Sequence, residues 1–184
     1  MKAVRVKTVW FRKGAARSPA ELASVLASTL WRLADKLVDN LSRAEYDIVT
    51  PERGFRIIAE VLALGLHLCD RWAWGRIDDP QRAALVQAIG ERLADTMESN
   101  VHGTRENFID MLNRRGADYA GFDIPAEGAG FPVLRYLAAQ VRESMDEHDQ
   151  HWVMDQMMEI ELPEALGTLK KTFDGLIAPA STAP

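Results

Sequence analysis

Apolar residues cover most of the circumference of one predicted helix, which spans residues 50–75. Thr50 is placed to cap its start, and Pro51 takes the first helical position, where its missing N–H costs nothing. The apolar positions that follow are Phe55, Ile57, Ile58, Val61, Leu62, Leu64, Leu66, Leu68 and Cys69. A helix that is apolar on most sides belongs in the middle of a bundle, so we predict that Leu62 and Leu66 are core residues.

The helix before this one has a clear start signal and an amphipathic pattern. Ser18-Pro19-Ala20-Glu21 combines an N-cap, a proline at the first position and the acid of a capping box. Apolar residues then recur at three- and four-residue steps, at Leu22, Val25, Leu26, Leu30, Leu33, Leu37 and Leu41. These spacings predict a long helix that ends near Asp47.

Further helix starts and stops follow along the chain. Asp78-Asp79-Pro80 predicts a helix that fades near Asn100, and a shorter helix is expected over residues 104–115, with Gly116 as its stop. Residues 116–131 are rich in Gly and predict an irregular connection. Pro132 and Pro163 are expected to open the last two helices, with a helical or kinked acidic segment, 146–161, between them.

These elements predict an all-α fold, an irregular bundle of about six helices around the central apolar helix, residues 50–75. We expect one helical domain over residues 18–178 and a flexible tail at 179–184. Residues 1–17 are expected to form a short extended arm, because Val4 and Val6 alternate with Arg5 and Lys7. Such a strand would need a partner for its backbone groups, and a second subunit could supply one. The pattern fits a frayed terminus equally well.

Charge is distributed unevenly along these 184 residues, whose net charge is −5. The arm carries six basic residues and no acid, whereas the segment from Arg142 to Glu164 holds eight carboxylates and a single Arg. An acidic body repels phosphates and so disfavours nucleic-acid binding. The arm is more simply explained by pairing with the acidic end of its own chain or of a partner subunit. No run of about 18 apolar residues occurs, so no membrane insertion is expected, and the lone Cys69 with no visible signal peptide favours a cytoplasmic protein.

Charged and polar residues fall on one side of the central helix and form the first candidate site. Glu60, His67, Asp70 and Arg71 share helical spacing there. His67 could act as an acid–base or ligand group oriented by the carboxylates, or it could be a histidine satisfied at a helix–helix contact. The second interpretation is the more common outcome for a single histidine.

Metal binding and catalysis have weaker signals. His148 and His151 lie one helical turn apart and are weak candidate metal ligands, but only one helix supplies recognisable ligands, so we expect neither a metal nor a cofactor there. A solvated acidic face explains this segment more simply. No catalytic motif occurs, and we expect a non-enzyme more than an enzyme.

Trp72 and Trp74 end the central helix and point in widely different directions, so we do not expect the two to enter the same core together. With Arg71 they form a candidate contact surface, since Trp and Arg are enriched at interface hot spots. The sequence therefore favours a helical binding protein that acts through self-association as a homo-oligomer, or as an accessory to another protein. The alternative is a bundle that binds a small molecule or metal through Glu60, His67 and Asp70, either as a binding protein or as an enzyme.

Overall fold

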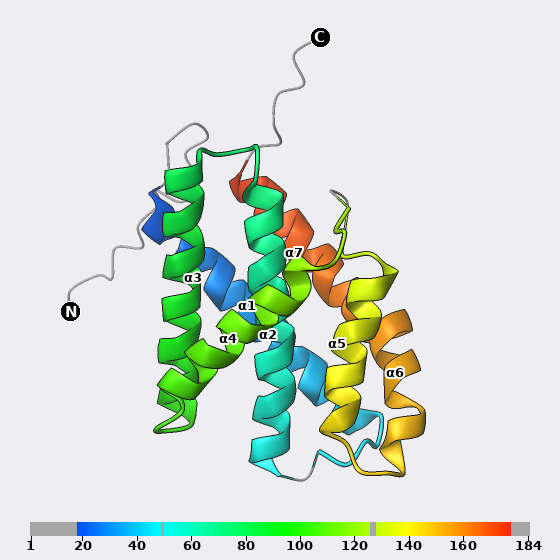
Figure 1. Cartoon of the computed structure of the whole chain (residues 1–184). Helices are drawn as coiled ribbons and strands as arrows, with labels where there is room; N and C mark the ends of the chain where they lie inside the picture. Colours follow the sequence, from blue (N-terminus) through cyan, green and yellow to red (C-terminus); the bar gives the residue numbers. More distant parts are fainter. Residues whose placement is uncertain (1–17, 49, 126–127, 178–184) are drawn as a thin grey trace, which may run out of the picture.

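The described part of the chain is a bundle of helices without strands (Figure 1). The computed structural model describes residues 18–48, 50–125 and 128–177. The helices are α1 (Pro19–Arg43), α2 (Pro51–Ala73), α3 (Asp79–Asn100), α4 (Arg105–Ala120), α5 (Phe131–Glu143), α6 (Val153–Gln156) and α7 (Leu162–Leu176). A 3₁₀ turn, η2 (Asp149–His151), precedes α6, and a π-helix, η3 (Met157–Glu161), joins α6 to α7. The predicted arm, residues 1–17, and tail, residues 179–184, lie outside the described residues.

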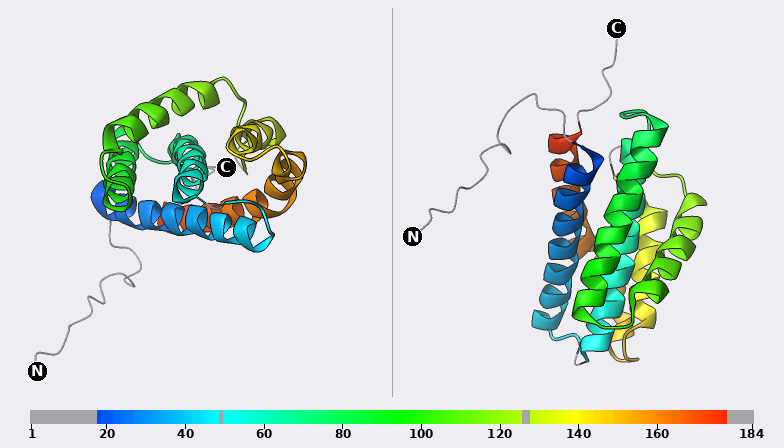
Figure 2. Two further views of the ribbon diagram at one scale, coloured as in Figure 1. Left: turned by 90° about the horizontal axis from the view of Figure 1, so that it is seen from below. Right: turned by 90° about the vertical axis from the view of Figure 1, so that its left-hand side faces the viewer.

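The predicted central helix is confirmed. Seen end-on in Figure 2, α2 lies inside a ring formed by the other helices. It contacts α1, α3, α4, α5 and α7. Leu62, Leu64 and Leu68 on α2 are fully buried, and one contiguous apolar core runs from Leu22 in α1 to Ile177 after α7. The all-α bundle around an apolar helix therefore follows from the hydrophobic pattern.

The predicted helix starts are also confirmed, because the capping side chains make the expected contacts. Ser18 Oγ accepts a hydrogen bond from the backbone N–H of Glu21, whose carboxylate accepts in turn from the backbone N–H of Ser18. Thr50 caps α2 and Asp78 caps α3 in the same way, each through the N–H three residues on. Each cap satisfies a donor that the first helical turn leaves free.

The prediction that Gly116 ends its helix is wrong, since α4 continues to Ala120. The extra turn places Tyr119 in the core, where its side chain is fully buried between the rings of His67 and Tyr136. Burying an aromatic side chain stabilises a fold by about 2–3 kcal/mol, whereas a glycine inside a helix costs about 1 kcal/mol. The tertiary contact of Tyr119 therefore outweighs the local preference of Gly116.

Most carboxylates of the acidic segment between α5 and α7 are exposed, as on a solvated face, but two of them are buried. Asp149 is buried and accepts a hydrogen bond of 2.6 Å from the backbone N–H of Asp47. Glu161 is buried and accepts from Asn40 Nδ2 at 2.8 Å. The π turn of η3 lies just before Pro163, whose ring would clash with the carbonyl of Glu159 in a regular helix. The wider turn lets α6 run into α7 without a break.

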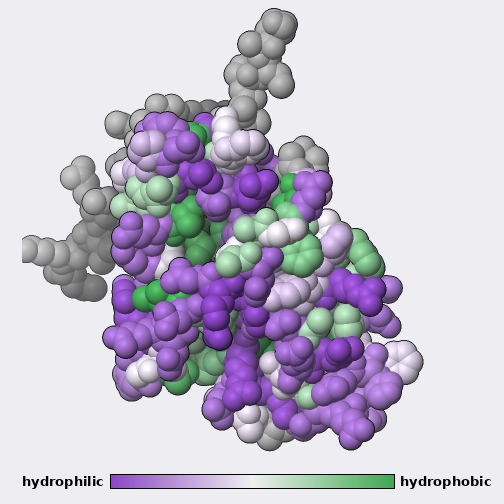
Figure 3. All heavy atoms as spheres, in the orientation of Figure 1, coloured by the Kyte–Doolittle hydropathy of each residue, from purple (hydrophilic) through white to green (hydrophobic). Residues whose placement is uncertain are grey.

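The outer surface is mostly hydrophilic on the face drawn in Figure 3, with a hydrophobic area between α3 and α2 at the upper left. Among the described residues, no helix is both long and apolar enough to cross a bilayer. Leu66 differs from our prediction, because it is only partly buried against the core. It lines a groove that belongs to the first candidate site.

Candidate functional site

The structure divides the predicted polar stripe of α2 among different environments. His67 and Asp70 line one groove, whereas Glu60 is held in a polar cluster elsewhere on the helix. Arg71 is exposed. The alternative interpretation grouped Glu60, His67 and Asp70 into one site, and Glu60 does not line the groove of the other two.

The groove that contains His67 and Asp70, hereafter the His67 groove, lies between α2, α3 and α4 and has a volume of about 750 Å³. Its apolar lining includes Ala63, Leu66, Val86, Ile109, Leu112 and Gly116. Its polar lining includes His67, Asp70, Arg82, Gln87, Glu91 and Arg105. The volume falls in the range typical of small-molecule sites, about 300–1,000 Å³.

His67 lines this groove and is partly buried, and its imidazole lies 5.6 Å, centroid to centroid, from the ring of Tyr119. Burial lowers the pKa of His67, and the positive charge of Arg71 lowers it further, while Asp70 acts in the opposite direction. The ring is therefore neutral at pH 7. Its Nε2 atom is buried and has no hydrogen-bond partner among the described residues.

Asp70 and Arg82 form an ion pair along the groove. Asp70 Oδ1 accepts from Arg82 Nη1 at 2.8 Å, and Arg82 Nη2 lies 3.4 Å from Asp79. Arg82 Nε, in contrast, is buried and finds no acceptor in the described part of the chain. The pair fixes the position of the guanidinium group but leaves one of its N–H donors unused.

Glu60 belongs to a separate cluster that joins α2, α4 and α5. Arg115 Nε and Nη2 each donate to the carboxylate of Glu60 at 2.7 Å, the two-point pairing that suits a guanidinium group. Arg115 also donates to Asp118 and to the hydroxyl of Tyr136, which in turn donates to Asp118 at 2.6 Å. Burial, followed by this last bond, raises the pKa of Tyr136 to about 12. In this cluster the donors and acceptors satisfy one another, and the contacts link α2, α4 and α5.

The two tryptophans at the end of α2 lie in different environments. Trp72 is buried with its ring 5.7 Å from that of Phe173, and the ammonium group of Lys170 lies 5.6 Å from the Trp72 ring. Trp74 is 64% exposed, and the guanidinium of Arg71 lies 5.6 Å from its ring. Only Trp74 and Arg71 are therefore available as a contact surface.

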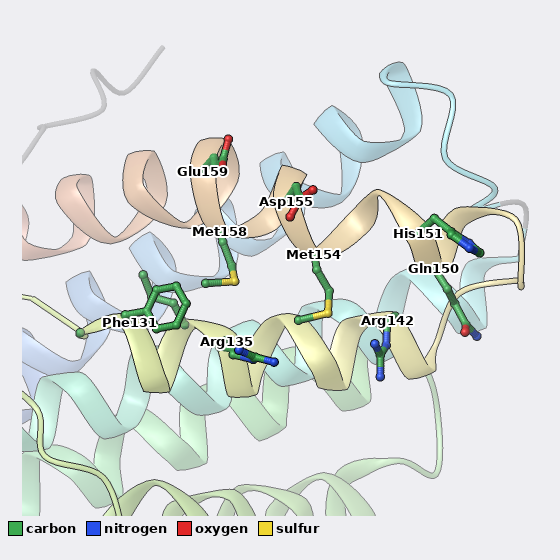
Figure 4. Close-up of a pocket in the computed structure, with 11 residues that line it drawn as sticks. Phe131, Arg135, Arg142, Gln150, His151, Met154, Asp155, Met158 and Glu159 are labelled. Carbon is green, nitrogen blue, oxygen red and sulfur yellow. The ribbon is translucent and has the colours of Figure 1, made fainter.

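A second groove, which the sequence did not reveal, lies between α5 and the α6–η3 segment (Figure 4). We call it the α5–α6 groove; its volume is about 790 Å³. Its apolar lining is Phe131, Leu134, Met154 and Met158. Figure 4 shows the two methionine side chains pointing from α6 and η3 toward α5, with Phe131 at one end.

The two sides of this groove carry opposite charges. Arg135 and Arg142 come from α5, and Asp155 and Glu159 from α6 and η3. All four side chains are exposed and form no ion pair with the rest of the described chain. A signal was available in the sequence, since Met154 and Met158 share one helical face.

The two weak candidate metal ligands do not lie together with other ligand side chains in the described part of the chain. His148 and His151 are both exposed, and His151 lines the α5–α6 groove with its Nδ1 3.4 Å from the carbonyl oxygen of Glu147. Nowhere in residues 18–48, 50–125 and 128–177 do three His, Cys, Asp or Glu side chains gather as a metal site would require. Burial raises the pKa of the Cys69 thiol to about 12, which makes it a poor nucleophile at neutral pH.

Comparison of the chain with protein-family models, with curated proteins and with solved structures gives no match. The two grooves and their chemistry therefore offer the best indication of function.

Proposed function

We propose that this chain is a binding protein that associates with a second copy of itself through the α5–α6 groove. The observation that supports the proposal most strongly is an apolar floor between walls of opposite charge. This site replaces the end of α2 as our first candidate surface, because there only Trp74 and Arg71 remain exposed.

The apolar floor favours contact with another protein surface. Phe131 is 64% exposed, although a phenylalanine contributes to folding only when it is buried. Met154 and Met158 are flexible and polarizable, and methionine-rich surfaces adapt well to a partner. Exposed apolar side chains that lie together and have a polar rim are typical of interaction sites.

The charges favour a second copy over an unrelated partner. When two copies meet face to face with their two-fold axis parallel to the groove, each α5 wall lies opposite the α6–η3 wall of the other copy. Arg135 and Arg142 of one copy then meet Asp155 and Glu159 of the next, twice in one interface. Such an interface is self-complementary, as a two-fold dimer requires, and the charges set its orientation.

Sedimentation equilibrium tests this proposal with a pair of charge variants. We expect the intact chain to be a concentration-dependent dimer. Arg135→Glu combined with Arg142→Glu should weaken dimerisation by at least about tenfold, because four attractive contacts become repulsive. The matched control is Arg92→Glu with Lys171→Glu, which makes the same charge change at exposed positions away from the groove and should dimerise as the intact chain does.

Two results would contradict the proposal. The intact chain could remain monomeric at about 1 mM, a concentration at which even a weak dimer forms. Alternatively, the groove variant and its control could lose the same affinity, which would indicate a general effect of net charge. A monomer whose groove binds an added amphipathic peptide would instead favour the accessory role that the sequence also allowed.

A further inference from the structure

We infer that the His67 groove binds a small uncharged molecule with an apolar body and a hydrogen-bonding oxygen. This site is separate from the proposed dimer surface, because the two grooves have no lining residue in common. Three features support it: the volume of the groove, two lining glycines that internal packing does not require, and two buried nitrogen atoms without partners among the described residues.

Two glycines in the middle of helices leave this groove open. Each costs about 1 kcal/mol of helix stability relative to alanine. A Cβ atom added to Gly116 of α4 would meet nothing within 4 Å, and one added to Gly90 of α3 would meet only Leu66 Cδ2, at 3.6 Å. Neither glycine has a positive φ angle. Packing within the chain therefore does not require them, unlike Gly65 of α2, where an added Cβ would lie 2.1 Å from Leu30 Cδ2.

Two nitrogen atoms of groove-lining side chains lack partners. Arg82 Nε is a donor, and His67 Nε2 is a donor or an acceptor according to the tautomer; both are buried and unpartnered in the described residues. A buried polar group left unsatisfied costs about 1–3 kcal/mol. Both side chains are partly exposed, so a small rotation of the imidazole or of the guanidinium group brings its nitrogen to a ligand oxygen.

The charges around the groove select an uncharged ligand. Asp70 is neutralised by Arg82, and Arg105 by Asp95 at 3.0 Å. Glu91 accepts a hydrogen bond from Gln87 at 2.9 Å. An anionic ligand would meet Asp70 and Glu91, and a cation would meet Arg82 and Arg105. With a neutral imidazole in the lining, a phenol, alcohol or ketone with an apolar body fits these surroundings best.

Isothermal titration calorimetry with two matched probes tests the inference. 2-Naphthol is neutral at pH 7, whereas 2-naphthoate has a similar shape and carries a negative charge. We expect 2-naphthol to bind at least about tenfold more tightly than 2-naphthoate. Equal binding of the two probes would contradict the assigned ligand class, and the absence of binding of either at about 1 mM would overturn the site.

Substitutions locate the binding. Gly116→Leu places a side chain in the groove and should weaken 2-naphthol binding by at least about tenfold. Gly167→Leu is its matched control, because Gly167 is a helical glycine of α7 whose added Cβ also meets nothing within 4 Å. His67→Leu removes the hydrogen bond and should weaken binding several-fold. Unchanged affinity in Gly116→Leu, with the helical spectrum intact, would place the probe elsewhere and overturn the inference.

A final measurement distinguishes this inference from the proposed dimer. The Arg135→Glu, Arg142→Glu variant should bind 2-naphthol with unchanged affinity, because neither residue lines the His67 groove. Loss of 2-naphthol binding in this variant would mean that the probe occupies the α5–α6 groove or the dimer interface.

Discussion

The two sides of α2 differ in how closely they approach their neighbours. On the side of α1 and α7, Gly65 allows such close contact that even a methyl group would overlap Leu30, and Leu169 of α7 lies just beyond. On the side of α3, α4 and α5, α2 presents Glu60, His67 and Asp70, which meet charged or aromatic partners. A groove of about 750 Å³ remains open on that side. Close packing on the first side stabilises the fold, whereas the second side positions polar groups and keeps the His67 groove open.

The largest effect should come from removing a buried side chain of α2. Leu62 is fully buried, so Leu62→Ala should lower the free energy of unfolding by about 2–5 kcal/mol through lost burial and a new cavity. Leu66, one turn on, is partly exposed at the His67 groove, and Leu66→Ala should cost less than about 2 kcal/mol. Urea denaturation followed by circular dichroism measures both, and equal losses would show that the open side of α2 is packed as closely as the other.

The Glu60–Arg115 pair provides the next test, because its side chains are only 12% and 20% exposed. Arg115→Leu should cost about 2–3 kcal/mol, since it leaves the Glu60 carboxylate without its partner in a poorly solvated place. The double variant Glu60→Leu, Arg115→Leu should lose less than the single one, because no unpaired charge remains. Chemical denaturation of the single and double variants gives the coupling free energy between the two side chains. Purely additive losses would mean that Glu60 and Arg115 do not stabilise the fold through their contact.

The two kinds of glycine should respond in opposite directions to the same substitution. Gly65→Ala should destabilise the fold by about 1–3 kcal/mol, because the new methyl group displaces the buried Leu30 side chain. Gly116→Ala should stabilise it by about 0.5–1 kcal/mol, because the site is open and alanine is the better helix former. Thermal unfolding of the two variants measures the difference. A destabilised Gly116→Ala would show that the groove is narrower than described.

The smallest effect concerns pH. Burial lowers the pKa of His67 in the folded state, so the unfolded chain takes up a proton more readily there. The contribution of neutral His67 to the free energy of unfolding is complete above about pH 6.5, the pKa of histidine in the unfolded chain. It is lost as the pH falls from there through the lower pKa of the folded state. Between pH 7 and 5, His67→Gln should therefore lose less stability than the intact chain. Parallel curves of unfolding free energy against pH for the two proteins would rule out this role for His67.

The hydrophobic pattern and the capping residues were sufficient to predict the helices and the central place of α2. Thr50, Ser18 and Asp78 are local signals, and a cap acts within three residues of its position. The end of α4 could not be read in this way, because the extra turn depends on Tyr119 meeting His67 and Tyr136, which are far away in the sequence.

The candidate sites were harder to predict from the sequence, because they too depend on contacts between residues that lie far apart along the chain. Spacing on α2 placed Glu60 and His67 on one side, but Arg115, 55 residues later, holds Glu60 in a different cluster. The α5–α6 groove depends on α5 lying beside α6 and η3, and nothing local to Phe131 or Met158 indicates that pairing. The polar stripe thus predicted part of the His67 groove and none of the α5–α6 groove.

Self-association through the α5–α6 groove is the central claim, and mixing two charge variants tests it most directly. One variant carries Arg135→Glu and Arg142→Glu, so both of its walls are acidic, and the other carries Asp155→Lys and Glu159→Lys, so both are basic. In sedimentation velocity each should be a monomer by itself, because like charges face each other across its dimer. Mixed in equal amounts they should form a one-to-one dimer that weakens as salt is raised. Two monomers that stay separate after mixing would contradict the account.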